Sequence, residues 1–307
     1  MIFMEIMYII VFLILIGYIS RHFKILDEKD RMVLNKIVIY IAMPSTIFLQ
    51  LLTNVTPSDL PEFMKLPVII FISTSVCALL AYFVGKRLKL DNKSLGGFVL
   101  VSSIGNTGFL GYPVILGFYG ESGLLRAIFC DMAAIFCSML LGTYIGVKLS
   151  GAKKSILKEV FTFPPLFTAL FTLILVLLHV KLSIFPEFFI KSLEYMSNAT
   201  IPLIMLSLGL SLSPKAAKFG IFYGLLASIF RMVISPLIAF PISESILSNQ
   251  LDKQVAIMQS AMPSAMMPLV YAVIYDLDVR LVASACFVST VVSLLVLPVI
   301  YTAMQTM

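Results

Sequence analysis

The run from Gly105 to Pro113 reads Gly-Asn-Thr-Gly-Phe-Leu-Gly-Tyr-Pro and lies inside an apolar segment at about residues 95–119. A proline inside a helix removes a backbone donor, and each glycine lowers helix propensity by about 1 kcal/mol relative to alanine. The pattern therefore predicts a broken helix whose freed backbone groups need polar partners away from bulk water. The helix that begins after the break offers N–H groups and the positive end of its dipole, which suit an anion. The substrate-binding residues predicted in this run are Asn106, Thr107, Gly108, Gly111, Tyr112 and Pro113.

A second apolar segment, at about residues 253–275, contains Met262-Pro-Ser-Ala-Met-Met-Pro268, in which two prolines are five residues apart. The prolines predict a second broken helix at a matching depth. Interrupted helices in corresponding halves of a chain are the best sequence pointer to a transporter binding site. Two proline kinks without a ligand are the alternative interpretation. The binding residues predicted here are Met262, Pro263, Ser264 and Pro268.

Two ionisable residues, Asp131 and Arg231, fall inside apolar segments. A charged side chain within a membrane span costs roughly 2.5–3.5 kcal/mol on insertion scales, so such residues usually have a purpose. Asp131 could take a proton or hold a cation beside the first break, or it could be a structural group bonded to nearby Asn, Ser or Thr side chains. Arg231 could pair with Asp131, attract an anionic substrate, or extend to the membrane interface. We expect both residues to act in coupling or gating.

Two further apolar segments each carry a proline beside small polar residues. We expect them to form a fixed wall opposite the moving part of the protein. The residues assigned to this wall are Pro44, Ser45, Asn198 and Pro202. The triplet Asn198-Ala-Thr200 matches an N-glycosylation pattern but lies within a predicted span, so we discount it.

The composition explains why these residues must act inside a membrane. Of the 307 residues, 60% are hydrophobic and 12% are charged, whereas soluble domains have about 25% charged residues. The mean hydropathy is +1.04. These values exclude a soluble globule and a disordered chain. The net charge is +6, but the basic residues lie between apolar runs and form no single basic face, so no nucleic-acid partner is expected.

Ten apolar segments are long enough to span a bilayer as helices. Cytoplasmic loops carry an excess of Lys and Arg. The odd-numbered connections between the segments contain 16 of these residues and the even-numbered connections contain 5. The odd-numbered connections are therefore predicted to be cytoplasmic, with both termini outside a plasma membrane. The ten segments lie at about 4–20, 32–52, 67–86, 95–119, 123–147, 164–180, 188–212, 219–243, 253–275 and 279–304.

The two halves of the chain show a weak internal repeat. Pro44 and Pro202 are 158 positions apart, Pro113 and Pro268 are 155 apart, and Arg126 and Arg280 are 154 apart. A nearly constant offset indicates duplication, and five spans per half would place the second half upside down, as in many secondary transporters. The predicted units are 1–150 and 164–307, joined by a cytoplasmic connection at 151–163.

The Gly105–Pro113 run, Gly120, Asp131, Arg231 with Pro236, and Ala261-Met-Pro-Ser-Ala resemble the bacterial and archaeal branch of the auxin efflux carrier family, whose members are often labelled malate or malonate permeases. The resemblance covers the whole chain. It implies a fold similar to bile-acid/sodium symporters, with spans 1, 2, 6 and 7 as a scaffold. Spans 3–5 and 8–10 would form a transport domain that moves like an elevator, in a homodimer.

The plant carriers of this family have Asn-Pro-Asn at the break and a long central loop, both absent here. These departures argue against auxin itself as the substrate. The family often has Lys where Arg231 stands.

The predicted function is transport of small organic anions, such as mono- or dicarboxylates, with H⁺ or Na⁺ as candidate coupling ions and no other cofactor. The chain has no nucleotide-binding P-loop and no HExxH motif, so an enzyme is not expected. Its two histidines and four isolated cysteines match no metal-site spacing. The alternatives are a sensor or receptor on the same fold, which would usually carry an added signalling domain, and an anion channel.

Overall fold

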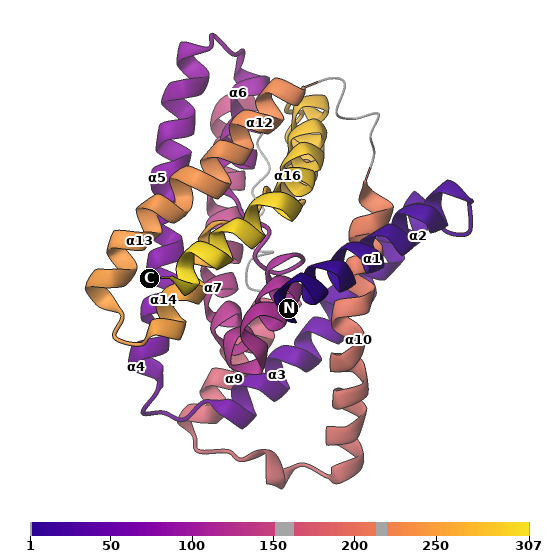
Figure 1. Cartoon of the computed structure of the whole chain (residues 1–307), viewed down its shortest axis with the longest axis vertical. Helices are drawn as coiled ribbons and strands as arrows, with labels where there is room; N and C mark the ends of the chain where they lie inside the picture. Colours follow the sequence, from indigo (N-terminus) through magenta and orange to yellow (C-terminus); the bar gives the residue numbers. More distant parts are fainter. Residues whose placement is uncertain (1, 151–162, 213–219, 307) are drawn as a thin grey trace.

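The computed structural model describes residues 2–150, 163–212 and 220–306. In these ranges the chain is almost entirely helical, which confirms the predicted all-α class (Figure 1). Residues 151–162 of the predicted cytoplasmic connection lie outside the described residues.

Five helical stretches of the described ranges are long and apolar enough to cross a membrane, and two shorter helices, Tyr8–His22 and Pro164–Leu177, are also apolar. Helices of this kind are characteristic of a multi-pass membrane protein. The five long stretches are Lys29–Asn54, Leu60–Arg87, Gly111–Leu149, Ile221–Ile246 and Val279–Gln305.

One group of helices is built around the crossing of α1 and α10. The helices approach closely at Gly17 and Gly209, where a Cβ atom would lie 2.3 Å and 2.0 Å from a backbone oxygen of the other helix. Small residues permit this kind of close helix packing in membranes. The group, which we call the first group, contains α1 (Ile2–His22), α2 (Glu28–Ile37), η1 (Val38–Ala42), α3 (Met43–Asn54), α9 (Pro164–Leu177), the 3₁₀ turn η2 (Leu182–Ile184) and α10 (Glu187–Ser211).

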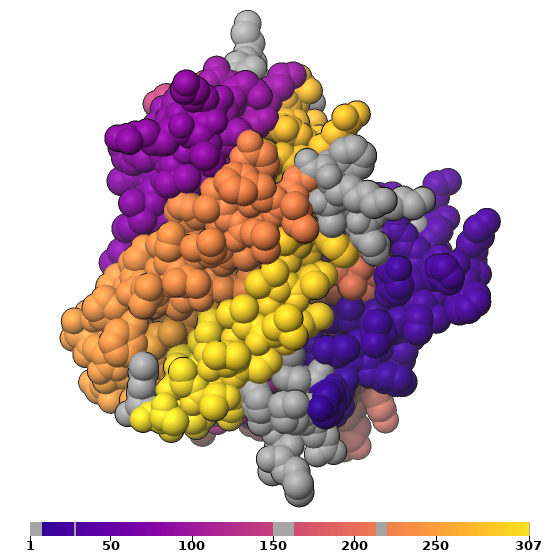
Figure 2. Space-filling view, turned by 45° about the horizontal axis from the view of Figure 1, so that its top comes forward, coloured from indigo at the N-terminus to yellow at the C-terminus, as the bar shows by residue number. Residues whose placement is uncertain are grey.

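The remaining helices form the second group. Helix α12 packs along α16, and Figure 2 shows the two side by side on one face of the molecule. The group contains α4 (Leu60–Phe63), α5 (Lys65–Arg87), α6 (Asn92–Ser103), α7 (Gly111–Ser150), α12 (Ile221–Ile229), η3 (Phe230–Ile234), α13 (Ser235–Ile246), α14 (Gln250–Ser260), α15 (Met267–Ile274) and α16 (Val279–Gln305).

Helices are interrupted at both predicted places. Helix α6 ends at Ser103 and α7 begins at Gly111, while α14 ends at Ser260 and α15 begins at Met267. Farther along, Gly120 has φ 65° and ψ −164° and divides α7 into two helical parts. This backbone region is essentially restricted to glycine. The division brings the second part of α7 back toward the first break, because Asp131 of that part contacts Thr107 of the break.

Short π-helical turns precede two of the prolines. The turn η1 ends just before Met43-Pro44, and η3 ends just before Ser235-Pro236. A proline cannot donate the usual helical hydrogen bond, and a π turn is one way for a helix to accommodate such a gap. The second turn carries Arg231, whose side chain lies at the centre of the site described below.

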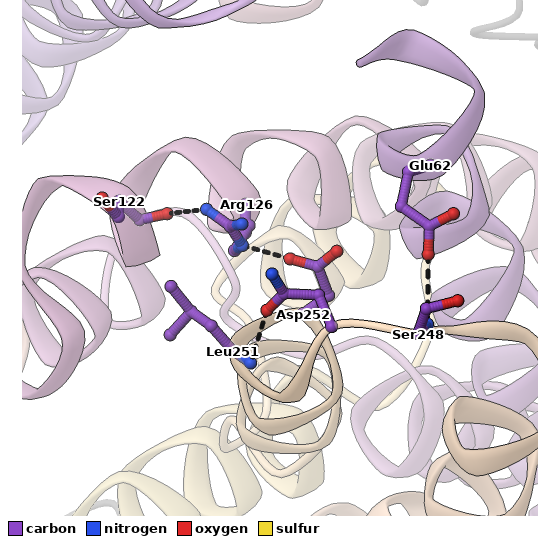
Figure 3. A network of polar contacts seen from close by, with 7 residues as sticks. Glu62, Ser122, Arg126, Ser248, Leu251 and Asp252 are labelled. Atoms are coloured by element: carbon purple, nitrogen blue, oxygen red, sulfur yellow. Dashed lines mark hydrogen bonds and ion pairs between the residues drawn. The ribbon is translucent and has the colours of Figure 1, made fainter.

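A buried ion pair ties α7 to α14. The guanidinium of Arg126 bonds the Asp252 carboxylate and also donates to the Ser122 carbonyl at 2.8 Å (Figure 3). The side chains are 12% and 2% exposed. Arg126 also lies over the Phe63 ring, 5.2 Å from its centroid. The pair therefore connects elements more than a hundred residues apart in sequence.

Candidate functional site

The two interrupted segments meet and pair through their backbones. Gly105 and Ser264 form an isolated antiparallel bridge. The Asn106 amide donates to the Pro263 carbonyl at 2.8 Å, and the Ala265 amide donates to the Ile104 carbonyl at 2.9 Å. These bonds satisfy part of the backbone that the breaks release. The two broken helices thus cross, as the sequence predicts.

Arg231 lies at this crossing with 2% of its surface exposed. Its Nη1 donates to the Ser103 carbonyl at 2.8 Å, and its Nη2 donates to the Ser260 carbonyl at 2.9 Å. Its Nε donates to the Met262 carbonyl at 3.0 Å. Among the described residues these partners do not include Asp131, and the side chain does not extend to an interface. Neither the pairing nor the interfacial interpretation of Arg231 therefore applies.

Asp131 is buried beside the first break, with 4% of its surface exposed. Its Oδ1 accepts a hydrogen bond from the Thr107 hydroxyl at 2.5 Å, and its Oδ2 accepts one from the Tyr112 hydroxyl at 3.1 Å. A Cβ atom at Gly108 would lie 3.1 Å from Oδ2, so the small residue admits the carboxylate. The structure thus brings together four residues that the sequence assigns to the site.

A cavity of about 210 Å³ lies between the two groups of helices and reaches the crossing. Of the predicted site residues, Asn106, Thr107, Gly108 and Asp131 line it. The second break contributes Ala265, Met266 and Met267, which lie between the predicted residues Ser264 and Pro268. Residues around both helix starts therefore face one space, which places two positive dipole ends near it. We call this space the inner cavity.

The first group supplies a polar wall of the inner cavity that the sequence reading did not include. This wall contains a cation, Arg31, and Asn35, which accepts a hydrogen bond from the Ser207 hydroxyl. Ser211 also lines the cavity. The sequence signal was weak, because Arg31 could be read only as one more basic loop residue. Its contribution depends on how α2 and α10 pack, which no local pattern encodes.

Asn106 is the most informative residue of the cavity. It is 5% exposed, and its side-chain Nδ2 has no hydrogen-bond partner among the described residues. Its backbone is fixed at both ends, because its amide bonds Pro263 and its carbonyl accepts the Gly111 amide at 2.9 Å. A buried donor without a partner costs about 1–3 kcal/mol. A buried amide donor on a residue that lines a cavity, without a partner among the described residues, is suited to an acceptor such as a carboxylate oxygen.

Gln259 is a second residue that sequence reasoning missed. It is fully buried near the end of α14, and its Nε2 donates to the Thr107 carbonyl at 3.3 Å. Its Oε1 has no partner among the described residues and lies 2.4 Å from where a Cβ of Gly111 would be. A glutamine inside an apolar segment just before a predicted break was the available signal. Gln259 links the second broken helix to the first.

A larger cavity of about 470 Å³, the outer cavity, lies on another side of the first break. Tyr112 lines the outer cavity, whereas its hydrogen-bond partner Asp131 lines the inner one. The Tyr112–Asp131 hydrogen bond therefore joins a residue of one cavity to a residue of the other. The outer cavity is the more polar one, and its polar residues are Thr46, Gln50, Tyr112, Glu121, Glu194, Ser197, Asn198 and Thr200.

Of the predicted wall residues, Asn198 lines the outer cavity. The Ser45 hydroxyl instead donates to the Ile41 carbonyl at 2.8 Å within its own helix. A polar contact between α3 and α10 comes from Thr46, whose hydroxyl lies 2.8 Å from that of Thr200. Among the described residues, the predicted site residues that line neither cavity are Pro44, Ser45, Gly111, Pro113, Pro202, Arg231, Met262, Pro263, Ser264 and Pro268.

Crossed broken helices between two apolar helix groups are characteristic of membrane transporters. The chain belongs to the membrane transport protein family, whose model matches residues 2–154 and 147–301. This is the auxin efflux carrier family that the motifs resemble.

Two relatives match over almost their whole length. An uncharacterized transporter of Methanocaldococcus jannaschii is 54% identical over 296 residues, which cover 96% of both chains. An uncharacterized transporter of Methanothermobacter thermautotrophicus is 37% identical over 286 residues, which cover 93% of both.

Proposed function

We propose that this protein carries small organic anions, mono- or dicarboxylates and auxin-like weak acids, across the plasma membrane. The observation that carries the proposal is the side chain of Asn106, which lines a cavity beside two helix starts and holds a buried amide donor without a partner among the described residues. A carboxylate in the cavity would accept a hydrogen bond from this amide and would lie close to Thr107. The positive ends of the two helix dipoles would favour its negative charge. The two dipole ends, the Asn106 amide and the Arg31 side chain that lines the same cavity would together favour an anion there.

The proposed architecture has ten spans in two inverted repeats of five. The first group would be the scaffold, and the second group, with both crossing helices, would be the transport domain. An elevator-type movement of the second group would carry the anion between the two sides. The position of the inner cavity between the groups supports this division. A homodimer held through the scaffold, with both termini outside, completes the proposal.

Asp131 is the proposed coupling or gating group. It lines the same cavity as Asn106 and is held by two hydroxyl donors. A proton or a cation at this carboxylate would remove a negative charge that opposes anion binding in the cavity. Coupling to H⁺ or Na⁺ would follow from this relation. The outer cavity, with the wall residue Asn198, would then form the part of the substrate path on the opposite side of the first break.

The test is substrate-induced current from proteoliposomes on a solid-supported membrane. Malate, malonate, succinate, lactate and indole-3-acetate would be applied in turn, with and without sodium or a pH step. We expect saturable currents for at least one anion and their loss in Asn106→Ala. Asn92→Ala is the matched control, because Asn92 is exposed and lines neither cavity.

The alternatives give different results. Conductance that does not saturate would indicate an anion channel. If the panel produces no current, radiolabel counterflow would be measured with the same folded protein. Counterflow would show electroneutral transport, whereas its absence together with specific anion binding would indicate a sensor or receptor. Equal loss of current in the Asn92 and Asn106 variants would remove Asn106 from the proposed binding role.

A further inference from the structure

The guanidinium of Arg231 bonds both broken helices at once. Its acceptors include the Ser103 carbonyl at the end of α6 and the Ser260 carbonyl at the end of α14. A third acceptor, the Met262 carbonyl, lies within the second break. The Ser235 hydroxyl is 3.3 Å from Nη1. Three of the four contacts are therefore backbone carbonyls released by helix termination.

The Arg231 side chain compensates the partial negative charge at the C-terminal ends of α6 and α14. The last four carbonyls of a helix have no partner within the helix, and they carry about half a negative charge. Two such ends converge here in a buried region. Arg231 brings one full positive charge and five donors in a planar fork. Its hydrogen-bond partners among the described residues include no carboxylate, so the two helix ends themselves compensate its charge.

The space around the guanidinium fits it closely. A Cβ atom on Gly105 would lie 2.2 Å from Nη2 and 3.0 Å from Cζ. Only glycine at this position leaves room for the planar group against the bridged backbone. The π turn η3 carries Arg231 to the level of both helix ends. The surroundings therefore form a pocket for one planar cation.

We propose that Arg231 is a positioning residue that acts as a built-in cation for the crossing. It neutralises the two converging helix ends and fixes the backbone bridge between Gly105 and Ser264. This role is independent of which anion the protein carries. The proposal predicts that a free guanidinium ion binds in the space left when Arg231 is replaced by alanine.

The experiment measures thermal unfolding of purified protein with a thiol-reactive fluorophore. The chain suits this method because Cys77, Cys130, Cys137 and Cys286 are all buried and free. Arg231→Ala is expected to lower the Tm by at least about 5 °C, since charged hydrogen bonds are lost. Millimolar guanidinium, far below denaturing concentrations, should raise the Tm of this variant by several degrees. Choline chloride at the same concentration, too large to enter, should not.

Arg231→Met and Arg231→Lys provide the matched comparison. Methionine fills the space without charge, so this variant should melt early and gain nothing from guanidinium. Lysine retains charge and three donors, so its Tm should lie between those of Met and wild type. If Arg231→Ala cannot be purified, the difference in Tm between Arg231→Lys and Arg231→Met still tests whether the positive charge stabilises the crossing. A Met variant as stable as the Lys variant, or equal effects of guanidinium and choline on Arg231→Ala, would overturn the proposal.

Discussion

Gly105 lies against the guanidinium of Arg231, although the two residues are far apart in sequence and belong to opposite halves of the chain. A Cβ atom at Gly105 would lie 2.2 Å from Nη2, a distance shorter than van der Waals contact allows. The guanidinium is also fixed by bonds to Ser103, Ser260 and Met262 and has little freedom to withdraw. Gly105 is therefore needed to leave space for the Arg231 guanidinium, in addition to its part in interrupting the helix.

Gly105→Ala is expected to destabilise the protein by about 1.5–3 kcal/mol, because the guanidinium must give up at least one charged hydrogen bond. Thermal unfolding followed by thiol exposure measures the effect. The control is the same substitution in an Arg231→Ala background, where the clash is absent. The alanine should then cost much less. Equal costs in both backgrounds would show that glycine matters only for the local backbone.

Asp131→Asn tests the coupling role. Asparagine keeps the size of the side chain and one acceptor oxygen, but its Nδ2 donates instead of accepting, and the group cannot bind and release a proton at neutral pH. We expect transport by the variant to lose its dependence on a pH gradient while some exchange of substrate persists. Transport currents and counterflow across a pH series measure both properties.

Tyr112→Phe is the matched control for Asp131→Asn. It removes one hydrogen bond to the carboxylate but keeps the titratable group. Its transport should remain dependent on pH, with a displaced midpoint. Unchanged pH dependence in Asp131→Asn would remove Asp131 from the coupling role and leave it as a structural acceptor for Thr107 and Tyr112.

The two breaks could be predicted because their cause is local. Proline and glycine disrupt a helix wherever they occur in it, and both interruptions lie at the predicted residues. The immediate partners of Asp131 could not be predicted, because they depend on how α7 divides at Gly120. The partners of Arg231 come from two other helices and depend on the crossing itself. Gln259 carried no motif, and only tertiary packing shows that it reaches Thr107.

The Arg126–Asp252 pair predicts an unequal effect of its two members. Asp252 is 2% exposed and would be left as a buried charge in Arg126→Met. Removing one partner of a buried pair typically costs about 3–5 kcal/mol. Asp252→Asn should cost less, because Arg126 is 12% exposed and keeps the Ser122 carbonyl and the Phe63 ring. Thermal unfolding of both variants measures the difference, and equal losses would contradict this assignment.

Gly209→Ala should separate α1 from α10. The added methyl group would meet the Ile14 carbonyl at 2.0 Å, and a backbone atom cannot rotate away. Overpacking of this kind costs about 1–3 kcal/mol. Gly17→Ala acts on the same contact from the other helix, so the two substitutions together should cost less than the sum of their separate effects. Additive losses in unfolding experiments would show that the helices do not meet at this pair.

The N-cap of α6 is expected to make the free energy of unfolding depend on pH at acidic pH. Asp91 is the N-cap of α6, and its carboxylate accepts the Lys93 amide at 2.9 Å and the Ser94 amide at 3.1 Å. These bonds, the one from the Ser94 amide foremost, lower the pKa of Asp91 below its ordinary value of 3.8. A lowered carboxylate pKa means that the stabilisation is fully present above that ordinary value. It is lost as the pH falls through the lower pKa of the folded state.

Asp91→Ala should therefore cost about 1 kcal/mol at neutral pH, a usual value for an N-cap. The difference from wild type should begin to shrink below about pH 4, where Asp91 of the unfolded chain becomes protonated, and should shrink further as the pH falls through the lower pKa of the folded state. Asp91→Asn keeps a capping oxygen at every pH, so its stability relative to Asp91→Ala should not change across the same range. Paired unfolding curves at neutral and acid pH measure these differences. A gap between wild type and Asp91→Ala that stays constant into acid would show that the charge of this cap does not contribute to stability.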